Sequence, residues 1–244
     1  LGLCRSRQYT KISTPLVEYK DVFNGYAMGR GQHMYEFMDS SDESVVIRPD
    51  LTMPIGRFLA TTNIELPRTF YYLGDVFMKN KKHRGDVNQV TQGGIEMVGY
   101  EGIEAEQECF AIIKEVNETQ LGNNLLLEIG DARFSRAITD ALGLSDEEKS
   151  ELLEALFTKY LPRYNQLISD FKNSALYPFL TVWPRLFGTV QDIKDELNQI
   201  ILPAGAQRIL DNLVDMANQV VQTGQQVRID VSTEPLQSYY TGLT

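Results

Sequence analysis

Residues 70–99, FYYLGDVFMKNKKHRGDVNQVTQGGIEMVG, constrain the fold of this chain more than any other segment. Two runs rich in aromatic and β-branched residues flank a polar loop, which is the pattern of two strands joined by a turn. The loop, residues 78–86, carries four basic residues and one acidic residue. We therefore expect a sheet-based fold that includes a β-hairpin with a charged tip.

The charged loop has two interpretations. On an acidic protein, a basic patch can bind phosphate, RNA or an acidic partner. A hairpin tip that is kept soluble by its charges is the simpler explanation, and composition alone favours it. The formal net charge is −10, whereas a nucleic-acid binder needs a basic surface to displace phosphate counterions. Nucleic-acid binding is therefore not expected.

Length and composition set the remaining limits. A chain of 244 residues with 43% hydrophobic residues is long enough for one large domain or a core with an appended subdomain. No apolar run approaches the roughly 20 residues that cross a bilayer, and the first ten residues lack the pattern of a secretory signal. Cys4 and Cys109 are too few and too far apart for a disulfide framework or a zinc site. We expect a cytoplasmic protein with no metal and no cofactor.

Segment patterns predict the order of elements. Strands are expected at residues 35–39, 44–48 and 125–129, and helices from Pro54 to Ala60 and over residues 102–120. Another helix should end near Gly143, and Ser145 with Glu148 forms a capping-box signature that opens the next one. Helical patterns then continue to about Thr223, and a strand returns at residues 227–231.

This order predicts an α+β fold, with a mixed, mostly antiparallel sheet flanked by helices and a helical insertion. Residues 1–144 and 224–244 are assigned to the core, and residues 145–223 to the insertion.

Two positions on the second strand of the hairpin are candidates for ligand binding. Gln92 and Glu96 are four residues apart, so their side chains lie on one face of a strand. A carboxylate on a core face must be paired or hydrogen-bonded, and Gly93 and Gly94 leave room for a ligand near the backbone. The alternative is an internal salt bridge, for instance with Arg48.

Other polar residues give weaker signals. Tyr239 and Tyr240 would face opposite ways in an extended segment, so one hydroxyl could meet a polar ligand while the other ring fills the core. His33 and His83 have no neighbouring nucleophile or acid at a catalytic spacing, and neither is assigned a role.

Several segments resemble the class II aminoacyl-tRNA synthetases, most closely the histidyl enzyme. Residues 14–18, TPLVE, are similar to the end of motif 1, which implies a dimer interface. Residues 47–52, IRPDLT, resemble the Leu-Arg-Pro-Glu-x-Thr segment that holds histidine, and residues 92–96, QGGIE, match the strand that reads the same amino acid. Residues 239–242, YYTG, match the end of the Arg-Gly-Leu-Asp-Tyr-Tyr-Thr-Gly signature.

The departures from that family fall on its ATP site. Met78 stands where motif 2 has the arginine that holds the α-phosphate, and Asp86 stands where a second arginine is expected. The signature's arginine and aspartate fall at Pro235 and Ser238. Electrostatic stabilisation of developing charge is usually the largest catalytic term, so these substitutions argue against adenylation.

This combination resembles the regulatory subunit of ATP phosphoribosyltransferase, the synthetase-like paralogue in the first step of histidine biosynthesis. The resemblance implies a subunit without catalytic activity that activates a short-form catalytic subunit and makes it sensitive to histidine. It also implies a dimer within a hetero-oligomer, a hetero-octamer by family resemblance, with histidine as effector. The candidate histidine-binding residues are Asp50, Thr52, Gln92, Glu96, Tyr239 and Tyr240.

Two other functions stay open at this point. One is a histidyl-tRNA synthetase with a degenerate ATP site, in which lysines of the basic loop replace the lost arginines. Because arginine binds phosphate in a bidentate geometry, lysine is a poor substitute. The other is a synthetase-like RNA-binding or stress-sensing module that uses the basic loop.

Overall fold

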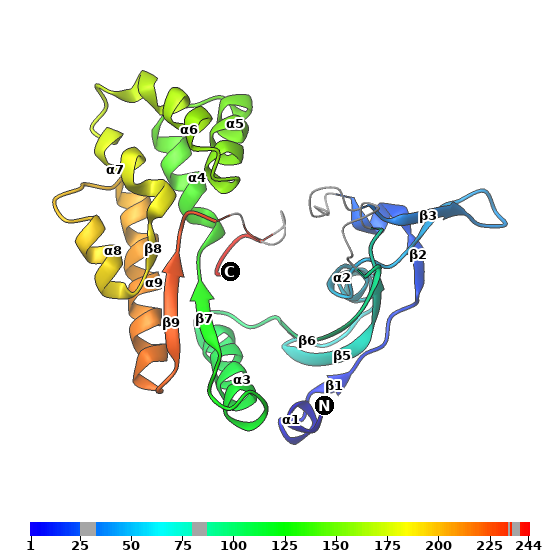
Figure 1. The fold of residues 1–244 in the computed structure, drawn as a ribbon. Coiled ribbons are helices and arrows are strands. Elements are labelled where there is room, and N and C mark those ends of the chain that lie inside the picture. Colours follow the sequence, from blue (N-terminus) through cyan, green and yellow to red (C-terminus); the bar gives the residue numbers. More distant parts are fainter. Residues whose placement is uncertain (25–32, 80–86, 234, 236–239) are drawn as a thin grey trace. The chain divides into compact units, whose positions relative to one another are not determined.

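The computed structural model describes residues 1–24, 33–79, 87–233, 235 and 240–244. The chain divides into two compact units, Leu1–Ile113 and Lys114–Thr244, which are considered separately below. The boundary falls inside helix α3 (Glu104–Gln120), which occupies the amphipathic segment expected at residues 102–120. Figure 1 shows the elements of each unit along the sequence.

The first unit contains short helices and two small sheets among its described residues. Its helical elements are α1 (Gly2–Ser6), the 3-10 helix η1 (Lys20–Phe23) and α2 (Thr52–Thr61). Its strands are β1 (Thr10–Lys11), β2 (Val17–Tyr19), β3 (Tyr35–Met38), β4 (Ser44–Ile47), β5 (Arg68–Phe77) and β6 (Gln89–Val98). The sheets have the orders β1-β5-β6 and β2-β4-β3.

The predicted hairpin is confirmed as the antiparallel pair β5 and β6. Directly opposite one another are Phe70 and Glu96, Tyr72 and Gly94, and Gly74 and Gln92. Since side chains alternate along a strand, these six positions share one face of the hairpin. The core cluster of Leu51, Ile55, Tyr72 and Val76 includes residues of this face and of α2 with its N-cap.

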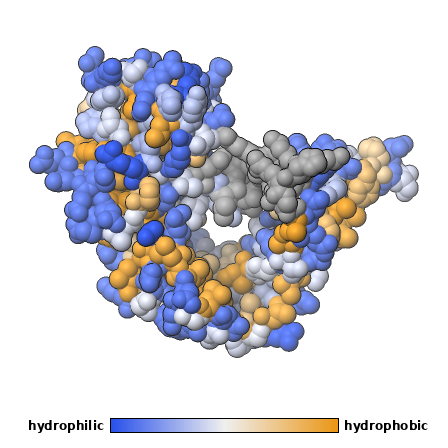
Figure 2. Space-filling model, in the orientation of Figure 1, coloured by the Kyte–Doolittle hydropathy of each residue, from blue (hydrophilic) through white to orange (hydrophobic). Residues whose placement is uncertain are grey.

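The sheet β2-β4-β3 is antiparallel throughout. Side-chain exposure alternates along strand β2, because Glu18 is buried whereas Val17 and Tyr19 are about half exposed, at 43% and 54%. Phe37 on β3 lies on the same face as Tyr19 through their shared partner Val45, and it is also exposed. Figure 2 shows apolar side chains gathered at the surface over these strands.

The second unit is mostly helical. Its helical elements are α4 (Ala132–Ala141), α5 (Asp146–Phe157), α6 (Leu161–Ile168), η2 (Ser169–Phe171), α7 (Tyr177–Val182), η3 (Trp183–Arg185), α8 (Val190–Glu196) and α9 (Ala204–Gln222). Its strands β7 (Leu126–Ile129), β8 (Phe187–Gly188) and β9 (Gln226–Asp230) form a sheet of order β7-β9-β8. Helix α9 packs against β9 and α4, as Figure 1 shows.

Local sequence accounts for several helix ends in this unit. The capping box at Ser145 is confirmed, because its hydroxyl accepts the Glu148 N–H while the Glu148 carboxylate accepts the Ser145 N–H. Thr189 and Asp192 form a second capping box at α8. Gly143, two residues after α4, has a φ of 69°, a conformation that glycine adopts without strain.

An aromatic cluster forms the core of the second unit. Phe134, Phe179 and Trp183 are fully buried, and their ring centroids are 5.3–6.4 Å apart. The Trp183 indole N–H donates to the Val231 carbonyl oxygen at 2.8 Å, and the Tyr164 hydroxyl donates to the Leu180 carbonyl oxygen at 2.8 Å. The polar tips of these large side chains are therefore satisfied inside the core.

The α+β fold class is confirmed. Within the described residues the strands are shared among three small sheets of mixed and antiparallel type. The two-residue strand β8 lies inside the segment for which helical patterns were expected, and it was not predicted because two residues are too few to show the alternation of a strand. The predicted division into a core and an insertion stays a prediction.

Candidate functional site

Asp50 and Thr52 stand at the start of α2 in the first unit. Asp50 is 6% exposed, and one of its carboxylate oxygens accepts the Met53 N–H at 2.9 Å. The Thr52 N–H also hydrogen-bonds to this carboxylate. Pro49 and Pro54 on either side restrict the backbone. The chain therefore holds Asp50 in a fixed position through the free N–H groups of the helix end.

Thr52 connects this helix end to the hairpin. Its hydroxyl donates to an oxygen of the Glu96 carboxylate at 2.8 Å. The Tyr72 hydroxyl lies 3.5 Å from the Thr52 hydroxyl and also hydrogen-bonds to Glu96. These contacts fix the Glu96 side chain on the hairpin face described above.

Gln92 completes the group. Its side chain hydrogen-bonds to the Asp50 carboxylate, which requires the amide NH₂ to point that way. The amide oxygen of Gln92 is buried and has no hydrogen-bond partner in the part of the chain that the structure describes. Since buried polar atoms are nearly always paired, this orphaned acceptor suits a ligand that brings an N–H donor.

The pKa values of the Asp50 and Glu96 carboxyl groups are both raised above their ordinary values. Burial raises the pKa of Asp50, although its hydrogen bonds act in the opposite direction. Burial also raises the pKa of Glu96, and the negative charge of Asp50 raises it further. Among the described residues, neither carboxylate forms an ion pair. A cation placed between the two carboxylates would stabilise their charged forms and so lower both pKa values.

Within the residues that the structure describes, the site therefore presents acceptors without a matching cation. Two carboxylates and an unpaired amide oxygen favour a small ligand with a positive charge and several N–H groups. The described residues contain no group of three His, Cys, Asp or Glu side chains suited to hold a metal ion. The acceptors around Asp50 and Glu96 suit the binding of such a ligand.

Tyr72 is a site residue that the sequence analysis missed. An added Cβ at Gly94 would overlap the Tyr72 phenol, so the ring occupies the space that Gly94 leaves open. The expectation that this glycine makes room for a ligand was therefore wrong at Gly94. The register of the hairpin could have identified it, because counting from the loop along both strands places Tyr72 directly opposite Gly94.

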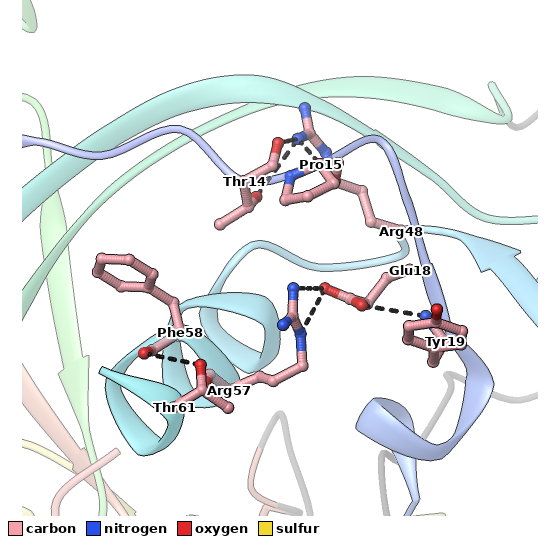
Figure 3. A network of polar contacts seen from close by, with 8 residues as sticks. All are labelled: Thr14, Pro15, Glu18, Tyr19, Arg48, Arg57, Phe58 and Thr61. Carbon is pink, nitrogen blue, oxygen red and sulfur yellow. Dashed lines mark hydrogen bonds and ion pairs between the residues drawn. The ribbon is translucent and has the colours of Figure 1, made fainter. Parts of the chain in front are cut away.

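The suggested salt bridge between Arg48 and Glu96 is also wrong. Figure 3 shows the Arg48 guanidinium directed at the segment of Thr14 and Pro15. Its Nε donates to the Asp75 carbonyl oxygen at 2.9 Å. Glu96 is thus left free of this cation.

The remaining predicted positions fall elsewhere. Tyr240 belongs to the second unit, where the following residues 242–244 pair with Gly130 and Ala132. Tyr239, His83 and nearly all of the basic loop lie outside the described residues. His33 forms a backbone bridge with Lys79 and is not part of the group around Asp50.

Comparison with known proteins identifies the family. A sequence model described as histidyl-tRNA synthetase matches residues 1–244. The chain belongs to the histidyl-tRNA synthetase family. It is 38% identical over 244 residues to an ATP phosphoribosyltransferase regulatory subunit of Limosilactobacillus fermentum, covering 100% of this chain and 63% of the relative. It is 40% identical over 240 residues to the protein of that name from Lacticaseibacillus paracasei, covering 96% and 62%.

This chain thus spans less than two thirds of the length of these two relatives. Solved structures give the fold. An ATP phosphoribosyltransferase regulatory subunit/histidyl-tRNA synthetase from Bacillus halodurans has a TM-score of 0.80 at 22% identity, covering 98% of this chain and 63% of that one. The ATP phosphoribosyl transferase (HisG:HisZ) complex from Thermotoga maritima has a TM-score of 0.69 at 16% identity, covering 99% and 82%. The class II synthetase-like fold is therefore confirmed.

No helix in the described part of the chain has the length and apolar character needed to span a membrane.

Proposed function

We propose that this chain acts as a regulatory subunit of ATP phosphoribosyltransferase, without catalytic activity of its own, and that it binds histidine. The observation that carries the proposal is similarity over the whole chain to relatives of that name, at 38–40% identity for the two described above. The geometry of the site supports the histidine part, because it offers acceptors for the cationic ammonium group of an amino acid.

Contacts around Asp50 and Glu96 support the amino-acid side of the proposed site. The ammonium group of histidine would lie between Asp50 and Glu96, and one of its N–H groups would satisfy the Gln92 amide oxygen. Thr52 and Tyr72 would hold the Glu96 carboxylate in place. Tyr239 and Tyr240 stay candidates for lining the imidazole, as the family resemblance implies.

The nucleotide side differs from that of the synthetases at position 78. Met78, which follows directly after β5, occupies the position of the phosphate-binding arginine in the synthetases. A thioether is a weak acceptor without charge, so it cannot stabilise a developing phosphate charge. This supports a role in sensing histidine rather than in activating it.

The proposed partners are the catalytic subunit of a short-form ATP phosphoribosyltransferase and a second copy of this chain. A solved neighbour is a complex of two ATP phosphoribosyltransferase proteins, and the exposed apolar residues of β2 and β3 offer a face for self-association. A dimer within a hetero-octamer in the cytoplasm is the assembly that the family resemblance implies.

An activity assay tests the proposal. Phosphoribosyl-ATP formation from ATP and phosphoribosyl pyrophosphate is measured for a short-form catalytic subunit alone, with this chain, and with this chain plus histidine. We expect the rate to rise on mixing and to fall again with histidine. No change in rate with a correctly folded partner would contradict the regulatory function. Histidine-dependent exchange between ATP and pyrophosphate would instead support a synthetase.

Calorimetric titration with histidine tests the site directly. Glu96→Gln removes one charge but keeps an acceptor for the Thr52 hydroxyl. Because hydrogen bonds to charged groups contribute about 1.5–3 kcal/mol, we expect affinity to fall by about tenfold to a hundredfold. Glu65→Gln, at an exposed position outside the site, is the matched control and should bind as the wild type does.

A further inference from the structure

Two arginines tie both flanks of the Asp50–Thr52 segment to the chain around β2. Arg48 precedes the segment by two residues, and Arg57 lies one turn further along α2 than its first residues. Figure 3 shows both side chains reaching residues between Thr14 and Glu18. Neither arginine contacts the group formed by Asp50, Thr52, Gln92 and Glu96 through any hydrogen bond of the described residues.

Arg48 binds main-chain carbonyl groups from two directions. Its Nη1 donates to the Thr14 carbonyl oxygen at 2.6 Å and to the Pro15 carbonyl oxygen at 3.3 Å, and its Nε donates to that of Asp75 at 2.9 Å. A Cβ added at Gly74 would lie 2.7 Å from the Arg48 guanidinium, so this glycine admits the side chain. The strand β4 that leads to Asp50 is therefore fixed to both the β1–β2 connection and β5.

Arg57 forms an ion pair with Glu18 of β2. Its Nε and Nη2 lie 2.9 and 2.8 Å from one oxygen of the Glu18 carboxylate. The other oxygen accepts the Tyr19 N–H at 3.1 Å. Glu18 is only 4% exposed, and removing the partner of a buried charge is costly. This ion pair therefore fixes α2 to β2.

We propose that Arg48 and Arg57 are positioning residues for histidine, acting through the Thr14–Glu18 segment. The proposal rests on the proposed histidine-binding function. Ligand groups must be held within about 0.5 Å of their binding geometry by supporting contacts. The contacts of Arg48 and Arg57 set the direction in which Asp50 and the first turn of α2 approach β6. They thereby set the spacing between the Asp50 and Glu96 carboxylates.

The alternative is that these contacts only stabilise the first unit. A purely structural role lowers the melting temperature but leaves the dissociation constant of the folded protein unchanged. A positioning role raises the dissociation constant at a temperature where the variant is still folded. The two roles are therefore separated by measuring both quantities on the same samples.

The experiment is calorimetric titration with L-histidine of the wild type, Glu18→Gln, Arg57→Lys and Arg48→Lys, with thermal melts of each. Arg57→Lys keeps the charge opposite the buried Glu18 but loses the two-nitrogen contact, so it is the variant expected to stay folded. We expect affinity to fall by roughly threefold to thirtyfold, the range found for residues that act on a site from outside it.

Lys20→Gln is the matched control. It removes the 2.7 Å ion pair of Lys20 with Glu36, which lies in the same part of the unit and joins η1 to β3 without involving a residue of α2 or of the Asp50 segment. Its affinity should stay within twofold of the wild type. Unchanged affinity in Arg57→Lys and Glu18→Gln, with wild-type binding intact, would overturn the positioning role alone. If the wild type itself fails to bind histidine, the proposed histidine function falls, and the positioning role falls with it.

Discussion

The two units differ in how far their buried polar groups are hydrogen-bonded within the protein. In the second unit the indole of Trp183 and the hydroxyl of Tyr164 are buried and hydrogen-bonded to carbonyl groups. Gln225 is an exception, because both polar atoms of its buried amide have no hydrogen-bond partner within the described part of the chain. In the first unit the buried Asp50 and the partly buried Glu96 have raised pKa values, and the Gln92 amide oxygen has no partner among the described residues.

This difference separates a scaffold from a site. Satisfied polar groups in a close-packed core favour one rigid arrangement. Buried acceptors without a cation reduce stability until a ligand arrives, and such sites are where functional proteins accept a stability cost. We infer that the second unit is optimised for packing and that the first unit reserves its polar groups for binding.

The largest effect is expected from the aromatic core of the second unit. Phe134 is fully buried between Phe179 and Trp183, so Phe134→Ala leaves a cavity. Substitutions of this kind lower the free energy of unfolding by about 3–5 kcal/mol. Urea unfolding followed by the fluorescence of Trp183, the single tryptophan of the chain, measures it. A loss below about 1 kcal/mol would show that this core is loosely packed and would weaken the comparison.

A smaller effect is expected at the hairpin of the first unit. Gly94→Ala places a methyl group against the Tyr72 phenol, and overpacking of this kind costs about 1–3 kcal/mol. Gly93→Ala is the matched control, because its added Cβ is close only to the half-exposed Leu73 side chain, at 3.2 Å, which can move away. Its 3.7 Å distance to the Tyr72 carbonyl oxygen is an ordinary contact. Chemical denaturation of both variants tests the difference. Equal losses at the two glycines would contradict the role given to Tyr72.

The helix cap at Ser145 should matter less. Ser145→Ala removes the hydroxyl that accepts the Glu148 N–H, a loss that typically costs about 1 kcal/mol. Thermal unfolding of the variant measures it. A cost as large as that of Phe134→Ala would mean that local capping, rather than the aromatic core, dominates the stability of this unit.

The smallest change is expected from Glu96→Gln, and its sign is opposite. Because the folded state raises the pKa of Glu96, it binds a proton more readily than the unfolded state does. The free energy of unfolding of the wild type therefore falls as pH rises from the ordinary value of about 4.5 towards the raised pKa. The free energy of unfolding of the glutamine variant does not fall in this way. The variant should therefore become more stable relative to the wild type across that pH interval. Urea unfolding at a series of pH values measures the gain, and a loss of stability at neutral pH would contradict it.

Local features were predictable from sequence, whereas side-chain partners across the fold were not. The hairpin, the Ser145 cap and the shared face of Gln92 and Glu96 depend on residues close in the chain, where periodicity and capping rules apply. The hydrogen bond from Thr52 to Glu96 joins residues 44 positions apart. The Arg48 side chain is directed at the carbonyl groups of Thr14 and Asp75. Because every residue type carries a carbonyl group, no sequence pattern could predict this direction.

That feature of Arg48 has an evolutionary consequence. Main-chain acceptors survive any substitution, so the bonds from Arg48 to the carbonyl oxygens of Thr14, Pro15 and Asp75 place little constraint on those residue types. The Thr14 hydroxyl, 3.3 Å from the Arg48 guanidinium, and the charge of Asp75 add a weaker constraint through side chains. Glu18 and Arg57 meet through side chains, so a change at one requires a compensating change at the other. Aligned relatives should thus show stronger covariation between positions 18 and 57 than around position 48, although both arginines hold the same segment.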